Sequence, residues 1–300
     1  MSSKRFVTQL CRGFSSATRT RPFQVAIDGP AASGKSTTAK MVAQRLGFSY
    51  IDTGAFYRCV TFAALSEGID PSHLSNADKI TALAEKLDIE LQTVFSEKPD
   101  SYNRTTSDWN SASDASRQHQ LPTTRVFLDS KDVSSDIRTG TVSKHVSAVA
   151  AIGPVREAVL QKVRNIGATD VEAQTNNGIN SSARSRAAGL VMDGRDIGTV
   201  VLPLADLKVF LVADSHVRAK RRLQELVKNG ADPSIDDTHL NLHAVQADLE
   251  LRDEMDRTRK ISPLRRAVDA MDLDTSNLTL EQQVDIIVQE VHRRRSHQKT

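Results

Sequence analysis

The chain is poor in cysteine and has no long apolar run, and each shortage excludes a class of protein. Its two cysteines, Cys11 and Cys59, are too few for a disulfide framework, and no Cys/His cluster has zinc-like spacing. No apolar run approaches the roughly 20 residues that a membrane-spanning helix requires. We therefore expect a soluble intracellular protein with no membrane association, in which Cys59 is a small core residue.

Acidic residues are absent from the beginning of the chain. Five basic residues precede the first acid, Asp28, and taking their five positive charges from the formal net charge of +3 leaves −2 for the remainder. This remainder lacks the overall positive charge of a nucleic-acid-binding protein, so no nucleic-acid partner is expected. The length of 300 residues and the hydrophobic content of 39% predict one large α/β domain with an inserted subdomain.

Residues 1–21 are basic, rich in Ser and Thr, and free of acids. This composition is typical of a mitochondrial presequence and lacks the continuous apolar stretch of a secretory signal, with residues 12–16 resembling a processing region. The alternatives are a basic tail without an address and a cytoplasmic location. We predict the mitochondrial matrix, and we expect the tail to lie outside the fold.

A glycine-rich segment links a strand-like apolar run at 23–27 to a helix-like run at 37–46. It matches the pattern G-x-x-x-x-G-K-S, whose backbone N–H groups and helix N-terminus bind phosphate, while its lysine reaches the terminal phosphates and its serine ligates magnesium. An ordinary turn that matches by chance is the alternative, but the flanking strand and helix supply the required context. The predicted ATP-binding residues of this loop are Gly29, Pro30, Ala31, Ala32, Ser33, Gly34, Lys35, Ser36 and Thr37. The loop alone does not choose between motor, switch, transporter and kinase.

Strand-like and helix-like segments alternate along much of the chain, which implies a parallel sheet. Further strands are expected at 49–51, 190–192 and 207–212, and helices at 55–66, 215–229, 239–259 and from about Thr279. A second group breaks the alternation with a small antiparallel element. It contains helices at 76–87, 135–149 and 154–163 and strands at 89–95 and 125–128.

These segments divide the chain into a core and an insertion. We assign the core to 22–66 and 189–300, with a lid near 215–232, and the insertion to 67–166. The segments 96–122 and 167–188 are mostly polar and cannot bury enough apolar surface to offset the entropy of ordering. Both are expected to be surface loops.

Two polar clusters follow strand-like runs, where open α/β sheets bind ligands. After the second strand, Thr53, Tyr57 and Arg58 bring hydroxyl and guanidinium donors to a helix start and indicate a second phosphate site. After the run at 190–192, Asp193 is placed to hold magnesium and Arg195 to neutralise a transferring phosphate. A tight Asp-Gly turn with a surface ion pair is the alternative for the latter cluster.

Two helices carry further charged groups. The spacing of Arg252, Asp256 and Arg259 places them on one helix face. They form either a binding site or an exposed charge network. Arg218, Arg221 and Arg222 form a basic cluster that either closes over triphosphate oxygens or is solvated.

Five segments in the same order resemble bacterial-type cytidylate kinases from about residue 23 to the end. They are IDGPAASGKSTTAK, IDTGAFYR, PVREA, MDGRDIGTVV and LRDEMDRTR. The resemblance implies an α/β P-loop nucleoside monophosphate kinase fold, with a parallel core sheet flanked by helices, a monophosphate-binding insertion and a short lid. It also implies a monomer that uses ATP and Mg²⁺ to convert CMP or dCMP to CDP or dCDP.

The resemblance assigns roles to the polar residues. Lys35, Arg58 and Arg195 would be catalytic, Ser36 and Asp193 would hold magnesium, and Arg218 and Arg222 would cover ATP from the lid. CMP would be bound by Thr53, Tyr57, Arg58, Ser147, Arg156, Arg195, Asp196, Arg252, Asp256 and Arg259. An aspartate for the amino group, with arginine and serine donors for the ring nitrogen and carbonyl, complements cytosine.

Two departures and two alternatives accompany this assignment. Ala31 stands where some relatives have a hydroxyl residue, and Thr53 stands where many have serine. Both departures are expected to affect affinity for the acceptor. A P-loop switch without catalysis would have no use for the cytosine-matching Asp196 and Arg156. A kinase for another small acceptor, such as shikimate or a different monophosphate, is the closer alternative.

Overall fold

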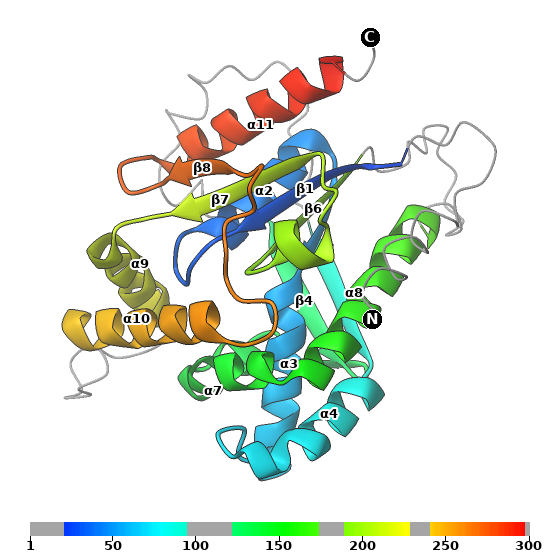
Figure 1. Cartoon of the computed structure of the whole chain (residues 1–300), viewed down its shortest axis with the longest axis vertical. Helices are drawn as coiled ribbons and strands as arrows, with labels where there is room; N and C mark the ends of the chain where they lie inside the picture. The colour runs from blue at the N-terminus through cyan, green and yellow to red at the C-terminus, as the bar shows by residue number, and fades with distance from the viewer. Residues whose placement is uncertain (1–20, 95–121, 174–188, 229–240, 298–300) are drawn as a thin grey trace.

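The computed structural model describes residues 21–94, 122–173, 189–228 and 241–297 (Figure 1). The presequence-like tail, but for its last residue Arg21, and nearly all of the predicted loop 96–122 lie outside the described residues. Where the chain is described, five parallel strands form the core sheet in the order β2-β6-β1-β7-β8. Their bounds are Phe23–Asp28 for β1, Ser49–Asp52 for β2, Gly189–Gly194 for β6, Leu207–Val212 for β7 and Met271–Asp274 for β8. The predicted parallel sheet is confirmed.

Helices cover both faces of this sheet because its strands are apolar on both faces. Val25 and Ile27 of β1 pack on the side of α2 (Lys35–Leu46) and α11 (Leu280–His297), whereas Ala26 packs on the side of α3 (Thr53–Ser66). Figure 1 shows α11 on one side of the sheet and α3 on the other. The three layers place the carboxyl ends of the strands at one open edge.

A second sheet of three antiparallel strands lies beyond α3. It contains β3 (Ile89–Val94), β4 (Thr123–Leu128) and β5 (Lys131–Asp132). The accompanying helices are α4 (Ala77–Lys86), α7 (Gly140–Ala151) and α8 (Gly153–Ala173), with short helical turns at η1 (Leu74–Asn76) and η2 (Asp136–Arg138). Its core is continuous with the α3 side of the main sheet, since Val126, Ile80 and Phe56 belong to one buried cluster. The predicted antiparallel element is confirmed.

The remaining helices flank the open edge. They are α9 (Ser215–Lys228), α10 (Leu242–Thr258) and a π-helical turn, η3 (Ile197–Val201). Thr279 and Gln282 exchange both hydrogen bonds of the expected capping box, at 2.9 and 3.2 Å, just before α11.

The structure differs from the sequence-based expectation at three places. The predicted loop 167–188 is helical as far as Ala173, because α8 continues through a run of helix-compatible residues; 174–188 lie outside the described residues. The helix expected from 135 begins at Gly140, because the extended Thr139 caps it by accepting from the Val142 N–H. The edge strand β8 was missed, since its alternating Met-Asp-Leu-Asp pattern is short and half-exposed.

The glycine at the end of β1 generates a stability prediction. A Cβ at Gly29 would lie 2.3 Å from the Leu211 carbonyl oxygen of the neighbouring strand, and φ is +157° there. Gly29→Ala should therefore lower the free energy of unfolding by about 1–3 kcal/mol, through overpacking against backbone. Urea unfolding measures this change.

Gly140→Ala is the matched control, because nothing lies within 4 Å of a Cβ there. It should leave stability unchanged or raise it by up to about 1 kcal/mol, since alanine favours the helix. Equal effects of the two substitutions would contradict the close-approach argument.

Candidate active site

The phosphate loop leaves the end of β1 and runs into the N-terminus of α2. Gly34 has φ +92°, a left-handed conformation that glycine adopts without strain, and Lys35 begins the helix. The Lys35 ammonium donates to the Pro30 carbonyl at 3.0 Å. Burial, followed by the nearby Arg195 charge, lowers the pKa of Lys35 from 10.5 to about 7. A buried cation therefore faces the loop without a full neutralising partner.

Strand pairing brings the first acidic residue of β6 to this loop. In register, Ile27 of β1 and Asp52 of β2 both lie opposite Asp193. The Ser36 hydroxyl donates to Asp193 Oδ2 at 2.6 Å, and the Tyr50 hydroxyl donates to Oδ1, also at 2.6 Å. Burial, and then the charge of Asp52, raises the pKa of Asp193.

The Ser36 and Asp193 oxygens fit a magnesium ion, which takes hard oxygen ligands and usually only one or two carboxylates, with water and substrate phosphate completing its shell. Among the described residues, no group of three or more His, Cys, Asp and Glu side chains could hold a metal. The protein's contribution would thus be this hydroxyl–carboxylate pair.

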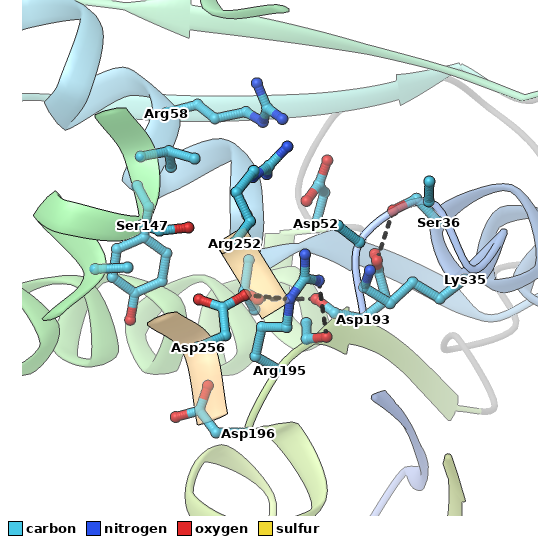
Figure 2. A pocket seen from close by; sticks show the side chains of 18 of the residues that line it. Lys35, Ser36, Asp52, Arg58, Ser147, Asp193, Arg195, Asp196, Arg252 and Asp256 are labelled. Atoms are coloured by element: carbon cyan, nitrogen blue, oxygen red, sulfur yellow. Dashed lines mark hydrogen bonds and ion pairs between the residues drawn. The ribbon is translucent and has the colours of Figure 1, made fainter. Parts of the chain in front are cut away.

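A single cavity of about 290 Å³ joins the phosphate loop to the polar residues of α3, α7, α8 and α10. Seven of its lining side chains are basic and five are acidic, so it suits an anionic ligand. In Figure 2, Lys35 and Ser36 lie at one end, Ser147 at the other, and Arg195 and Asp256 between them. The sequence-predicted residues that line it are Ala31, Ala32, Gly34, Lys35, Ser36, Thr37, Thr53, Tyr57, Arg58, Ser147, Arg156, Asp193, Arg195, Asp196, Arg222, Arg252, Asp256 and Arg259.

From its middle to the end remote from the phosphate loop, the cavity holds a chain of buried and half-buried ion pairs. Arg156 pairs with Asp196, and the Arg195 Nε donates to Asp256 Oδ2 at 2.8 Å. Arg259 lies 3.5 Å from Asp256 and 3.8 Å from Asp196. The two carboxylates are therefore shared among three guanidinium groups.

Arg252 lies in the same cavity with fewer partners. Its Nε is buried without a hydrogen-bond partner among the described residues. Burial, and then the charge of Arg195, lowers its pKa. A buried N–H group without an acceptor is costly, so an oxygen of a ligand beside this Nε would be stabilising.

Arg58 and Arg222 meet at one hydroxyl. Arg58 donates to Ser143 Oγ and to the Ile137 carbonyl, both at 3.0 Å, and Arg222 donates to the same Ser143 Oγ at 3.3 Å. Arg222 also pairs with Glu225 at 2.9 Å. Ser143 thus connects α3, α7 and α9. Sequence reasoning missed it because a lone serine in an amphipathic helix carries no motif.

Four predicted ATP-binding residues do not line the cavity. Three of them, Gly29, Pro30 and Ser33, lie in the phosphate loop but are not among the residues that line the cavity. Arg218 was expected to cover ATP from the lid, but its side chain is 6% exposed and is ion-paired with Asp253. The structure therefore places Arg218 against the phosphate loop and Arg222 at the cavity.

Asp28 was missed, although it directly precedes the first glycine of the loop. Its carboxylate accepts from the N–H groups of Ile197 and Gly198 at 2.8 and 2.7 Å, in the turn that follows Arg195 and Asp196. Burial raises the pKa of Asp28 from 3.8 to about 6, partly offset by these two N–H bonds. Asp28 therefore ties the β6 loop to the beginning of the phosphate loop.

The raised pKa of Asp28 predicts that the free energy of unfolding depends on pH. Because the value in the folded protein, about 6, exceeds the ordinary 3.8, the folded state binds the proton more tightly than the unfolded state. The resulting stabilisation is complete below pH 3.8 and is lost as pH rises through about 6. Asp28→Asn removes the titration, so the wild-type minus variant free energy of unfolding should fall across that window and then level off.

Urea unfolding of both proteins at a series of pH values measures the difference. Other acidic groups titrate in both proteins and cancel in the subtraction. A difference that is constant from about pH 4 to pH 7 would show that Asp28 keeps an ordinary pKa in the folded protein.

A phosphate loop on a parallel sheet, facing a second set of arginines and carboxylates across one cavity, defines a P-loop nucleoside monophosphate kinase fold. Comparison with known proteins then identifies the family within this class. Residues 25–293 match the family described as "Cytidylate kinase", and the chain belongs to that family. It is thus a kinase, a phosphotransferase.

Curated relatives carry the same name. "Cytidylate kinase" of Limosilactobacillus fermentum is 40% identical over 264 residues, which cover 88% of this chain and 93% of that protein. The "Cytidylate kinase" of Chloroherpeton thalassium is 40% identical over 271 residues, 90% of this chain and 94% of its own. That of Bacillus subtilis is 36% identical over 274 residues, 91% and 98%.

These relatives are bacterial, so they give no support to the predicted mitochondrial address of the tail. The family match begins after the tail, at residue 25. Within the described residues, no helix is both long enough and apolar enough to cross a membrane.

Proposed function

We propose that this protein transfers the γ-phosphate of ATP to CMP or dCMP, giving ADP and CDP or dCDP. The observation that carries the proposal is the cavity that joins the phosphate loop to the buried Arg156–Asp196 pair. A triphosphate matches the first end, and the hydrogen-bonding edge of cytosine matches the second. The family name of the chain and of its relatives agrees with this substrate.

The proposed base site distinguishes cytosine by its amino group. Asp196 accepts from the amino group, while Arg156 and Ser147 donate to the ring nitrogen and the carbonyl. Before substrate binds, Arg156 donates to Asp196, while its buried Nε has no hydrogen-bond partner among the described residues. Uracil would present a carbonyl to the Asp196 carboxylate, and this unpaired repulsion would disfavour UMP.

The remaining acceptor contacts follow from the hydrogen-bonding groups of the side chains: hydroxyls and guanidinium groups donate, and the Asp256 carboxylate accepts. Thr53, Tyr57, Arg58 and Arg195 would hold the acceptor phosphate, and Arg252 and Asp256 the sugar hydroxyls. The insertion 67–166 would then contribute Ser147 and Arg156 to the monophosphate site, and the segment 215–232 would act as the lid, with Arg222 at the cavity. The unpartnered Arg252 Nε supports an oxygen-bearing ligand at its position.

Catalysis would depend on alignment and charge neutralisation. The attacking group is a phosphate oxygen that is already ionised near neutral pH, so no strong general base is required. Lys35, Arg58 and Arg195 would neutralise charge that develops on the transferring group, and closure of the lid would exclude water as a competing acceptor. Ser36 and Asp193 would hold magnesium, which supplies further charge neutralisation on the phosphates.

The experiment that tests this function measures ADP formation from magnesium-ATP by protein lacking residues 1–21. CMP, dCMP, UMP, AMP, GMP and shikimate serve in turn as acceptor. Activity concentrated on CMP and dCMP is expected. Transfer to a different acceptor would support another small-molecule kinase, and ATP binding without transfer to any acceptor would support the non-catalytic module.

Lys35 generates a prediction that separates catalysis from folding. Lys35→Ala should lower kcat at least about 100-fold, because it removes a cation placed at the transferring phosphate. Stability should not fall, because burial disfavours the charged form of this side chain. Steady-state kinetics and thermal unfolding of the same preparation give both quantities.

Lys79→Ala is the control, since it removes an exposed lysine of α4. It should leave kcat and the unfolding temperature unchanged. A Lys35→Ala protein with wild-type kcat would contradict the proposed mechanism.

The mitochondrial address stays a prediction that only the composition of residues 1–21 supports. Isolated mitochondria incubated with the full chain should import and shorten it, and should not import protein lacking residues 1–21. Full-length protein that remains outside and protease-sensitive would instead favour a tail without an address.

A further inference from the structure

The outward-facing carbonyl groups of the phosphate loop need partners. When the N–H groups of such a loop point toward a phosphate, several of its carbonyls point away, into the protein, where each unpaired one is costly. Three side chains meet this need at Ala31 and Ser33. Arg218 donates to the Ala31 carbonyl at 3.1 Å, and both Thr275 (3.1 Å) and Arg221 (3.4 Å) donate to that of Ser33.

The backbone N–H, the backbone carbonyl and the methyl group of Ala31 all make contacts. Its N–H donates to Asp253 Oδ1 at 2.9 Å, and its carbonyl accepts from Arg218. Its methyl group packs in a small apolar cluster with Ala219 of α9 and with Val245 and Leu249 of α10. The loop residue at this position is therefore enclosed by one helix pair.

The Arg218–Asp253 pair completes the arrangement. Asp253 is 1% exposed and Arg218 6%, and they are joined at 2.5 Å, so both charges are almost fully removed from water. Burial of such a pair contributes little net stability compared with a well-packed apolar pair. The pair instead affects the position of the phosphate loop, because Arg218 and Asp253 each also hydrogen-bond to the backbone of that loop.

We infer that Arg218 and Asp253, together with Thr275, are positioning residues: they hold the phosphate loop in its ATP-binding conformation and do not themselves contact ATP. Asp253 also lies on α10 beside Arg252 and one turn from Asp256, both of which line the cavity. The same helix thereby sets the distance between the phosphate loop and the acceptor end. This inference rests on the proposed binding of ATP to the loop.

The test replaces the pair without leaving a buried charge alone. Arg218→Met combined with Asp253→Leu gives an apolar pair of similar bulk and avoids the penalty of an unpaired buried charge, and thermal unfolding checks that the variant is folded. The Ala31 N–H and carbonyl then lose their partners. We expect magnesium-ATP to bind at least about tenfold more weakly and kcat to fall, while CMP binding alone changes less than about twofold. Calorimetric titration with each nucleotide measures both affinities.

Arg257→Met is the matched control on α10. Its guanidinium lies 3.9 Å from Asp253 but is 53% exposed. Neither nucleotide affinity nor kcat should change in this variant. A double variant that binds CMP normally and also binds ATP as the wild type does would overturn the inference.

Thr275→Val provides a second measurement if the double variant does not fold. Valine has the same shape as this fully buried threonine but lacks the hydroxyl, so the variant loses one of the two donors to the Ser33 carbonyl; the same hydroxyl also lies 3.1 Å from the Val212 carbonyl. A loss of about threefold or more in ATP affinity with unchanged CMP affinity is expected, and unchanged ATP affinity would overturn the inference. A wild-type chain that binds no ATP would instead contradict the proposed function.

Discussion

The parallel pairing of β1 with β6 is the constraint on which the site depends. Backbone hydrogen bonds place Ile27 opposite Asp193 and Asp28 opposite Gly194, so the phosphate loop and the β6 loop leave the sheet at the same edge. The Ser36–Asp193 bond and the cavity between the loops follow from this register. A slip of one residue would turn every side chain of β6 to the other face and would separate these groups.

The site holds more buried positive charge than it neutralises. Burial lowers the pKa of Lys35, of Arg58 and of Arg252, which shows that each cation is held at some cost to the folded protein. Phosphate groups supply the missing negative charge when nucleotides bind. Proteins commonly place such unfavourable groups at functional sites, where the ligand and not the rest of the fold satisfies them.

Helix α10 connects the two ends of the cavity. It contributes Arg252 and Asp256 to the lining of the cavity and Asp253 to the phosphate loop, within little more than one turn. Because a helix is stiff over this length, a shift of the loop and a shift of the acceptor residues are coupled. In-line phosphoryl transfer requires a correct distance between the phosphate loop and the rest of the cavity. The position of α10 affects this distance because the helix contacts both.

Local patterns determined much of this protein from sequence alone. The strand–loop–helix around Lys35, the capping box at Thr279 and four of the five core strands were predictable because neighbouring residues form them, and the order of five motifs indicated the family. Tertiary structure alone decided that Arg218 braces the loop while Arg222, one turn later, reaches the cavity. It also decided the partners of Asp28 and Asp253. Their hydrogen bonds join residues far apart in the chain, and only the packing of the strands and helices brings such residues together.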